Sequence, residues 1–227
     1  TSPMSIPSST TPQVPAPGSH FNFAQHLIAC NAGRPAKTAY IDDAGSLSYG
    51  ELAERIRRLA AGLLASGVRR EERVLLLMHD CSDWPVSFLG AMYAGIVPVA
   101  VNTLLTSEDY ACMLEHSRAQ AVLVSSALLP MLQEAMGKAA HEVKTVIVSR
   151  PDGSLPEGSV ALDTLIQQHR SLSQPASTCP DDPGFWLYSS GPTGKPKGTL
   201  HLHANPSCTP DTERPPTHAR PERTRRG

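Results

Sequence analysis

The sequence has no long apolar run and almost no net charge. Its 227 residues include 20 Lys and Arg against 21 Asp and Glu, which gives a formal net charge of −1. This balance offers no indication of a nucleic-acid partner. No stretch approaches the roughly 20 apolar residues that a membrane-spanning helix needs. Residues 1–18 are rich in Pro, Ser and Thr and lack the basic and apolar regions of a secretory signal. We therefore expect a cytoplasmic protein with no nucleic-acid or membrane partner.

Metal-binding and disulfide patterns are also missing. The five cysteines are odd in number and contain no C-x-x-C pair, so we expect neither a disulfide framework nor a zinc site. Small buried thiols are the better interpretation of Cys30, Cys81 and Cys112. The nine histidines form no H-E-x-x-H motif. His201 and His203 have the spacing that puts both on one strand face, but no nearby Cys, Asp or Glu completes a ligand set, so an ordinary strand face is favoured over a metal site.

Alternating strand and helix patterns occupy most of the chain. Ser48 and Glu51 form a capping box at the start of a helical apolar pattern, and Gly67 is a stop signal for that helix. The charges of this helix are interpreted as a solvated face; they are Glu51, Glu54, Arg55, Arg57 and Arg58. Ser107, followed by two acids, predicts the start of a later helix. We expect helices over 21–31, 48–67, 84–95, 128–139 and 160–169 and a further helix that begins at Ser107. We expect strands over 38–42, 46–48, 73–78, 97–101, 121–125, 143–149, 185–188 and 199–203.

This order predicts an α/β fold with a mostly parallel sheet and helices on both faces. Residues 171–184 are interpreted as a linker. Residues 1–20 and 206–227 are predicted to be a disordered leader and tail, with an incomplete AMP-binding-type N-terminal domain over 21–205. The tail contains five Pro and five Arg but no large apolar residue. A solvated tail is favoured over a nucleic-acid-binding one, because no aromatic residue interleaves the arginines.

One loop, residues 188–199, has the composition of an anion-binding turn. Its glycines let backbone N–H groups approach oxygen atoms closely, its hydroxyls can donate hydrogen bonds, and its lysines supply positive charge. A Walker loop is excluded, because Ser189 stands five positions before Gly194 and Pro196 follows Lys195. The dinucleotide fingerprint G-x-G-x-x-G is missing as well. The remaining alternative is a plain solvated surface turn.

The run S-S-G-P-T-G-K-P-K-G at 189–198 resembles the phosphate loop of the adenylate-forming (AMP-binding) enzymes, with Pro192 where that family has Ser or Thr. Further stretches are similar to the family's N-terminal domain, and within the family the likeness is to aryl-CoA ligases such as benzoate-CoA ligase. These stretches are 21–24, 37–42, 48–52, 73–77, 91–99, 101–106, 185–190 and 201–205.

The resemblance implies a two-step reaction that uses ATP, Mg²⁺ and CoA. An aromatic carboxylate is activated as an acyl-adenylate and then transferred to the CoA thiol. The residues implied to bind ATP include hydroxyl donors, glycines with accessible N–H groups and two cations. They are Ser189, Ser190, Gly191, Thr193, Gly194, Lys195 and Lys197. A plain solvated lysine is a better alternative for Lys195 than for Lys197.

The resemblance also implies that parts of the family's sequence are absent, including its catalytic Lys. Pro192 removes a hydroxyl and an N–H from the loop, and each lost contact to phosphate costs about 1.5–3 kcal/mol. We therefore expect a truncated aryl-CoA ligase that has no catalytic residue of its own and is inactive alone. The alternatives are a non-catalytic nucleotide- or anion-binding module and a non-functional remnant.

Overall fold

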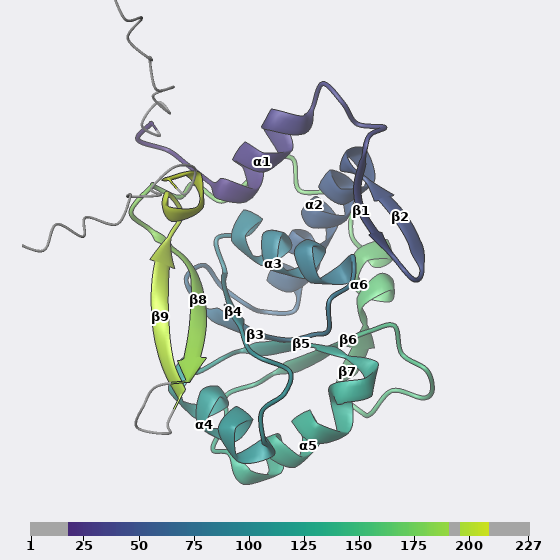
Figure 1. Cartoon of the computed structure of the whole chain (residues 1–227), viewed down its shortest axis with the longest axis vertical. Helices are drawn as coiled ribbons and strands as arrows, with labels where there is room; N and C mark the ends of the chain where they lie inside the picture. The colour runs from purple at the N-terminus through teal and green to yellow at the C-terminus, as the bar shows by residue number, and fades with distance from the viewer. Residues whose placement is uncertain (1–17, 191–195, 209–227) are drawn as a thin grey trace, which may run out of the picture.

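The computed structural model describes residues 18–190 and 196–208, and these form one α/β unit (Figure 1). Seven strands of the described chain form the main sheet, in the order β7-β6-β5-β3-β4-β8-β9. All neighbours in this sheet are parallel except β8 and β9, which form an antiparallel hairpin. The strands are β3 (Arg73–Leu77), β4 (Val97–Ala100), β5 (Ala121–Ser125), β6 (Thr145–Ser149), β7 (Ser159–Ala161), β8 (Pro183–Ser190) and β9 (Pro196–Leu202). The predicted fold class is confirmed.

Helices cover both faces of the sheet. Figure 1 shows α1, α2, α3 and α6 on one side and α4 and α5 on the other. Their bounds are α1 (Phe23–Asn31), α2 (Tyr49–Ala65), α3 (Asp83–Tyr93), α4 (Ser107–Ser117), α5 (Leu129–Lys138) and α6 (Leu162–Gln168). A separate two-stranded hairpin, β1 (Thr38–Asp42) with β2 (Gly45–Ser48), precedes α2. Two short 3₁₀ turns are η1 (Ser126–Leu128) and η2 (Asn205–Cys208).

The apolar run of β3 shows why a central strand needs hydrophobic residues at every position. Val74 and Leu76 belong to the core cluster under α2 and α3, whereas Leu75 and Leu77 belong to the cluster under α4. Side chains alternate across a strand, so a strand covered on both faces buries each of them. Two cores, one on each face, therefore fix the sheet between the helix layers.

Local capping signals set the helix starts. The Ser48 hydroxyl accepts from the Glu51 amide at 3.3 Å and the Glu51 carboxylate accepts from the Ser48 amide at 2.8 Å, as the capping box predicts. Gly67 adopts φ +86°, as expected for its stop position. The helix predicted at Ser107 begins there, but its cap is Thr106, whose hydroxyl accepts from the Asp109 amide at 3.2 Å.

The structure corrects several boundaries. Residues 159–161, expected to lie mostly in a helix, form the short edge strand β7 before α6, since three residues are too few to show a strand period. The helix expected from residue 128 begins as the turn η1 and becomes α-helical at Leu129. Residues 183–184 belong to β8 and not to a linker. The leader and tail predictions lie mainly outside the described residues and stay predictions.

The prediction of buried thiols is wrong. Cys30 and Cys112 are exposed, and Cys81 is only partly covered. Both exposed cysteines lie on the outward faces of amphipathic helices; Cys112, for example, stands between the buried residues Ala111 and Met113. Helical phase, rather than the hydrophobicity of the thiol, therefore decides their exposure. Within the described residues, no helix combines the length and the apolar character that crossing a membrane requires.

Candidate functional site at the carboxyl edge of the sheet

The helix α3 follows β3 on one face of the sheet, and α4 follows β4 on the other. In open α/β sheets ligands bind in the crevice outside the carboxyl ends of the strands. Strand β8 runs parallel to β4, with Ala100 opposite Leu187, so its carboxyl end lies at the same edge.

A pocket of about 470 Å³ lies at this carboxyl edge, beside the ends of β3, β4 and β8. Its lining combines apolar groups with polar side chains from the ends of three strands: Met78, His79, Asp80, Trp84, Ala100, Val101, Asn102, Thr103, Leu187 and Tyr188. Such a mixture of apolar walls and a few polar groups is typical of a small-molecule site. Sequence reasoning did not single out His79, Asp80 or Thr103, although each follows directly or closely after a buried strand.

The wall formed after β4 is held by Tyr110, a buried residue of α4. Its hydroxyl donates to the Asn102 carbonyl at 2.7 Å and accepts from the Leu105 amide at 3.2 Å. Burial raises the pKa of Tyr110, so its hydroxyl stays neutral and can make both contacts. The Asn102 side chain in turn accepts from the Leu104 amide at 2.9 Å. The turn that lines the pocket is thus fixed by hydrogen bonds.

The residues predicted to bind ATP lie around the end of the β8–β9 hairpin. Ser189 and Ser190 are the last residues of β8, and Lys197 is in β9, opposite Ser189 in the strand register. Lys197 is exposed and makes no ion pair with an acid of the described residues. Gly191, Pro192, Thr193, Gly194 and Lys195 lie outside the described residues. Their predicted contacts therefore stay predictions.

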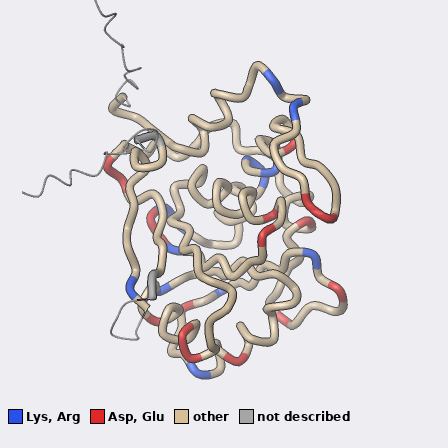
Figure 2. The backbone as a smooth tube through the Cα atoms, in the orientation of Figure 1, with Lys and Arg blue, Asp and Glu red and all other residues tan. Residues whose placement is uncertain are grey.

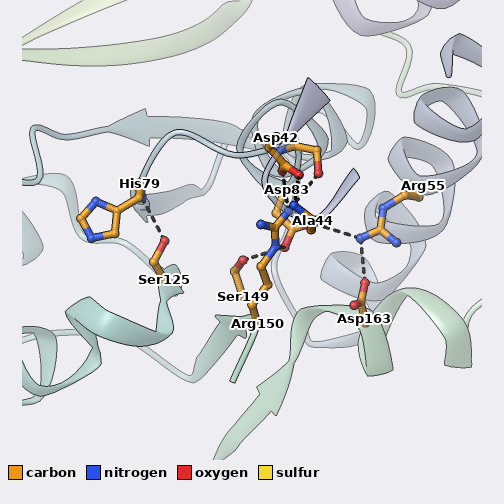
Figure 3. Close-up of polar contacts among 10 residues, drawn as sticks. Asp42, Ala44, Arg55, His79, Asp83, Ser125, Ser149, Arg150 and Asp163 are labelled. Carbon is orange, nitrogen blue, oxygen red and sulfur yellow. Dashed lines mark hydrogen bonds and ion pairs between the residues drawn. The ribbon is translucent and has the colours of Figure 1, made fainter. Parts of the chain in front are cut away.

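A network of charged groups holds the turn on the other side of the pocket (Figure 3). Asp42, at the end of β1, accepts from the Ser82 amide at 2.7 Å and from the Arg150 guanidinium at 2.6 Å. The same guanidinium donates to the Ser82 hydroxyl at 3.1 Å. The Ser82 amide and Arg150 hold the pKa of the Asp42 carboxyl far below its usual range. At the start of the turn, the His79 amide donates to the Ser125 hydroxyl at 2.9 Å.

Asp83 is the buried centre of this network. Its carboxylate accepts from the Ser149 hydroxyl at 2.6 Å and lies 3.1 Å from Arg55, which also pairs with Asp163 at 2.7 Å. The interpretation of Arg55 as part of a solvated helix face is therefore wrong, because acids from α3 and α6 meet it. Figure 2 shows basic and acidic residues of the described chain spread over the whole fold, with both signs mixed.

The two histidines with strand spacing make packing contacts. The His201 ring stacks on Phe185 with centroids 4.6 Å apart. His203 is fully buried, and its Nδ1 accepts from the Phe23 amide at 3.2 Å. In the part of the chain that the structure describes, no group of three or more His, Cys, Asp or Glu could hold a metal ion.

A mostly parallel sheet with a mixed pocket at the carboxyl ends of its strands is the architecture of a ligand-binding α/β domain. The model of the AMP-binding enzyme family matches residues 28–214, and the chain belongs to that family. It is 43% identical over 201 residues to a benzoate–CoA ligase of Thauera aromatica, covering 87% of this chain and 37% of that protein. It is 42% identical to a 4-hydroxybenzoate–CoA/benzoate–CoA ligase of Rhodopseudomonas palustris, covering 82% of this chain and 34% of that protein.

Solved structures of the same family have this fold. A benzoate CoA ligase from Burkholderia xenovorans LB400 matches with a TM-score of 0.72 and 48% identity, over 82% of this chain and 35% of that one. The anthranilate CoA ligase AuaEII, solved in complex with anthranoyl-AMP, matches with a TM-score of 0.76 and 27% identity over the same shares. The chain thus spans little more than a third of the length of these relatives.

Proposed function

We propose that this chain is part of a carboxylate–CoA ligase for benzoate or a related aromatic acid, and that its own task is to hold the phosphates of ATP. The observation that supports this most is the position of the β8–β9 hairpin. Its sequence resembles the family's phosphate loop, its strand β8 borders the pocket, and its strand β9 carries the exposed Lys197. The names of the relatives support the acid class. The complete reaction is assigned to a ligase of the relatives' length.

The proposed chemistry of this chain is electrostatic. Bound ATP would supply the adenylyl group that activates the carboxylate, with pyrophosphate as the leaving group, and CoA would supply the thiol that accepts the acyl group. The ammonium of Lys197, with that of Lys195, neutralises phosphate oxygens. The hydroxyls of Ser189, Ser190 and Thr193 and the amides of Gly191 and Gly194 donate hydrogen bonds. Donors that are held in place before the reaction stabilise the charge that develops on a leaving pyrophosphate. No Mg²⁺ ligand is assigned to the described residues, because they contain no suitable cluster.

Isothermal calorimetry of the whole chain with Mg·ATP tests the proposal. We expect one binding event that Lys197→Ala weakens at least tenfold, since a hydrogen bond to a charged group contributes about 1.5–3 kcal/mol. Lys144→Ala is the matched control. Lys144 is also exposed, but it directly precedes β6 and so lies at the amino ends of the parallel strands, away from the pocket. Absence of any heat, or equal losses in the two variants, would contradict the proposal.

A binding module without catalysis is the second candidate, favoured by Pro192 at a position where the family has a hydroxyl residue. Benzoate-dependent exchange of pyrophosphate into ATP separates the two candidates. Binding of Mg·ATP without exchange supports the module, whereas exchange supports a competent first step. The expectation that the chain alone is inactive stays a prediction.

A further inference from the structure

The end of strand β8 contacts α4, the helix that covers the face of the sheet on which Trp186 and Tyr188 pack. The Tyr188 hydroxyl lies 2.7 Å from Nδ1 of His116, a residue of the last turn of α4 that is 72 positions away in the chain. Their rings meet edge to face with centroids 5.9 Å apart, and the His116 ring also lies 6.0 Å from that of Trp186. A hydrogen bond and two ring contacts therefore converge on one histidine.

This contact occurs where the hairpin leaves the rest of the sheet. The pairing of β8 with β4 includes Trp186 and Leu187 and ends there, and from Tyr188 to Ser190 the strand pairs with β9. Among the described residues, no other side-chain hydrogen bond joins this part of the hairpin to a helix. Beyond Leu187, β4 no longer pairs with β8, and the His116 ring supports Tyr188 on that side instead.

The Tyr188 ring also lies beside Gly198 of β9. A Cβ atom added at Gly198 would lie 3.4 Å from the Tyr188 ring and 3.5 Å from the Trp186 ring, so both rings cover the space that this residue leaves. Burial raises the pKa of Tyr188 to about 12, and its hydroxyl is therefore neutral at ordinary pH and able to donate or accept. The hydrogen bond to His116 can form with either tautomer of the imidazole.

We propose that His116 is a positioning residue for the hairpin to which phosphate binding is assigned: through Tyr188 it holds the end of β8, and with it the paired strand that carries Lys197, in place for a nucleotide. The inference rests on the proposed function, and it adds a residue from α4 to a site otherwise formed by strand ends. His116 itself touches Tyr188 and Trp186 and is not assigned a contact with the ligand.

A double-mutant cycle measured by calorimetry with Mg·ATP tests this role. His116→Phe keeps a ring but removes Nδ1, and Tyr188→Phe removes only the hydroxyl. We expect each variant to weaken Mg·ATP binding about threefold to tenfold and the double variant to be no weaker than either single one, because all three lose the same hydrogen bond. His116→Asn, which keeps a polar atom near the position of Nδ1, should restore most of the affinity. His26→Phe, at an exposed histidine of α1, should change nothing.

Amide hydrogen exchange of the ligand-free variants provides a readout that is independent of ATP. We expect faster exchange in His116→Phe within residues 186–190 and unchanged exchange in β3 and β5. Faster exchange with wild-type affinity would mean that the contact is structural only, and would overturn the inference, as would unchanged exchange. If the unaltered chain gives no heat with Mg·ATP, the proposed function fails instead. If the double variant lost as much binding free energy as the two single variants together, the two residues would not act through their shared hydrogen bond, and the inference would fail.

Discussion

The turn after β3 and the strand β8 of the hairpin border the same pocket, and they are held in different ways. The turn between β3 and α3, residues 78–82, is fixed by the carboxylate of Asp42, the guanidinium of Arg150 and the Ser125 hydroxyl, all from other elements of the fold. The β8–β9 hairpin makes two register pairs with β4 and then depends on its own ladder and on the His116–Tyr188 contact. Its leucines at positions 187 and 200 are 41% and 46% exposed.

The difference indicates a division of labour within one site. A wall held by ion pairs and hydrogen bonds from several elements can keep its shape while a ligand enters, because moving it would break those contacts. A hairpin with fewer outside contacts can adjust to phosphates at a lower energetic cost. The charged network should therefore matter most for stability, and the hairpin most for binding. The following changes test that contrast.

The largest effect is expected from Asp83→Ala. The side chain of Asp83 is 7% exposed and contacts Arg55, Arg150 and the Ser149 hydroxyl, so its loss removes three polar contacts to one buried charged group. We expect the free energy of unfolding, measured by urea denaturation, to fall by about 3–5 kcal/mol. Asp163→Ala removes the exposed partner of Arg55, at 58% exposure, and should cost less than about 1 kcal/mol. Equal losses would show that burial of the network is not what stabilises this wall.

As the pH falls, the stability that depends on neutral His203, at the end of the hairpin, should be lost before the contacts of the charged network. Burial lowers the pKa of His203 to about 4, below its usual value of 6.5. The folded state then binds the proton less readily than the unfolded state, so this stability is fully present above about pH 6.5 and is lost as pH falls toward 4. The loss is about 1.4 kcal/mol for each pH unit in that window.

Urea denaturation across pH 4 to 7 checks this expectation. The free energy of unfolding should depend less steeply on pH in His203→Asn than in the unaltered protein. His26→Asn should leave this dependence unchanged. Asp42, whose pKa is held below its usual range by Ser82 and Arg150, keeps its contacts throughout the window. A His203→Asn profile as steep as that of the unaltered protein would assign the acid sensitivity to other groups.

A smaller effect is expected from Gly184→Ala at the base of the hairpin. The added Cβ would lie 2.9 Å from the backbone at Leu202 and His203, which cannot move aside without disturbing β9. We expect a loss of about 1–3 kcal/mol in the free energy of unfolding. Gly198→Ala, whose added Cβ meets only side chains at 3.4 Å or more, is the matched control and should lose less. A tolerated Gly184→Ala would mean that the base of the hairpin is more adaptable than its geometry indicates.

Features that depend on neighbouring residues were predictable from the sequence, and features that join distant residues were not. The both-sided burial of β3, the capping box of Ser48 and the stop at Gly67 are all set within a few positions. The Asp42–Arg150 pair joins residues 108 positions apart, and the His116–Tyr188 contact joins residues 72 positions apart. These four residues carry charged or amphipathic side chains and belong to no local sequence motif. Nothing nearby in the sequence therefore indicates which distant residue each one contacts.

Amide hydrogen exchange of the whole chain with and without Mg·ATP tests the central claim most directly, namely that the hairpin binds the phosphates while the charged wall stays fixed. The account predicts slower exchange within residues 186–200 on addition of Mg·ATP and no change in residues 79–83. Lys197→Ala should abolish the slowing. Unchanged exchange in the hairpin, or protection confined to residues 79–83, would contradict the account.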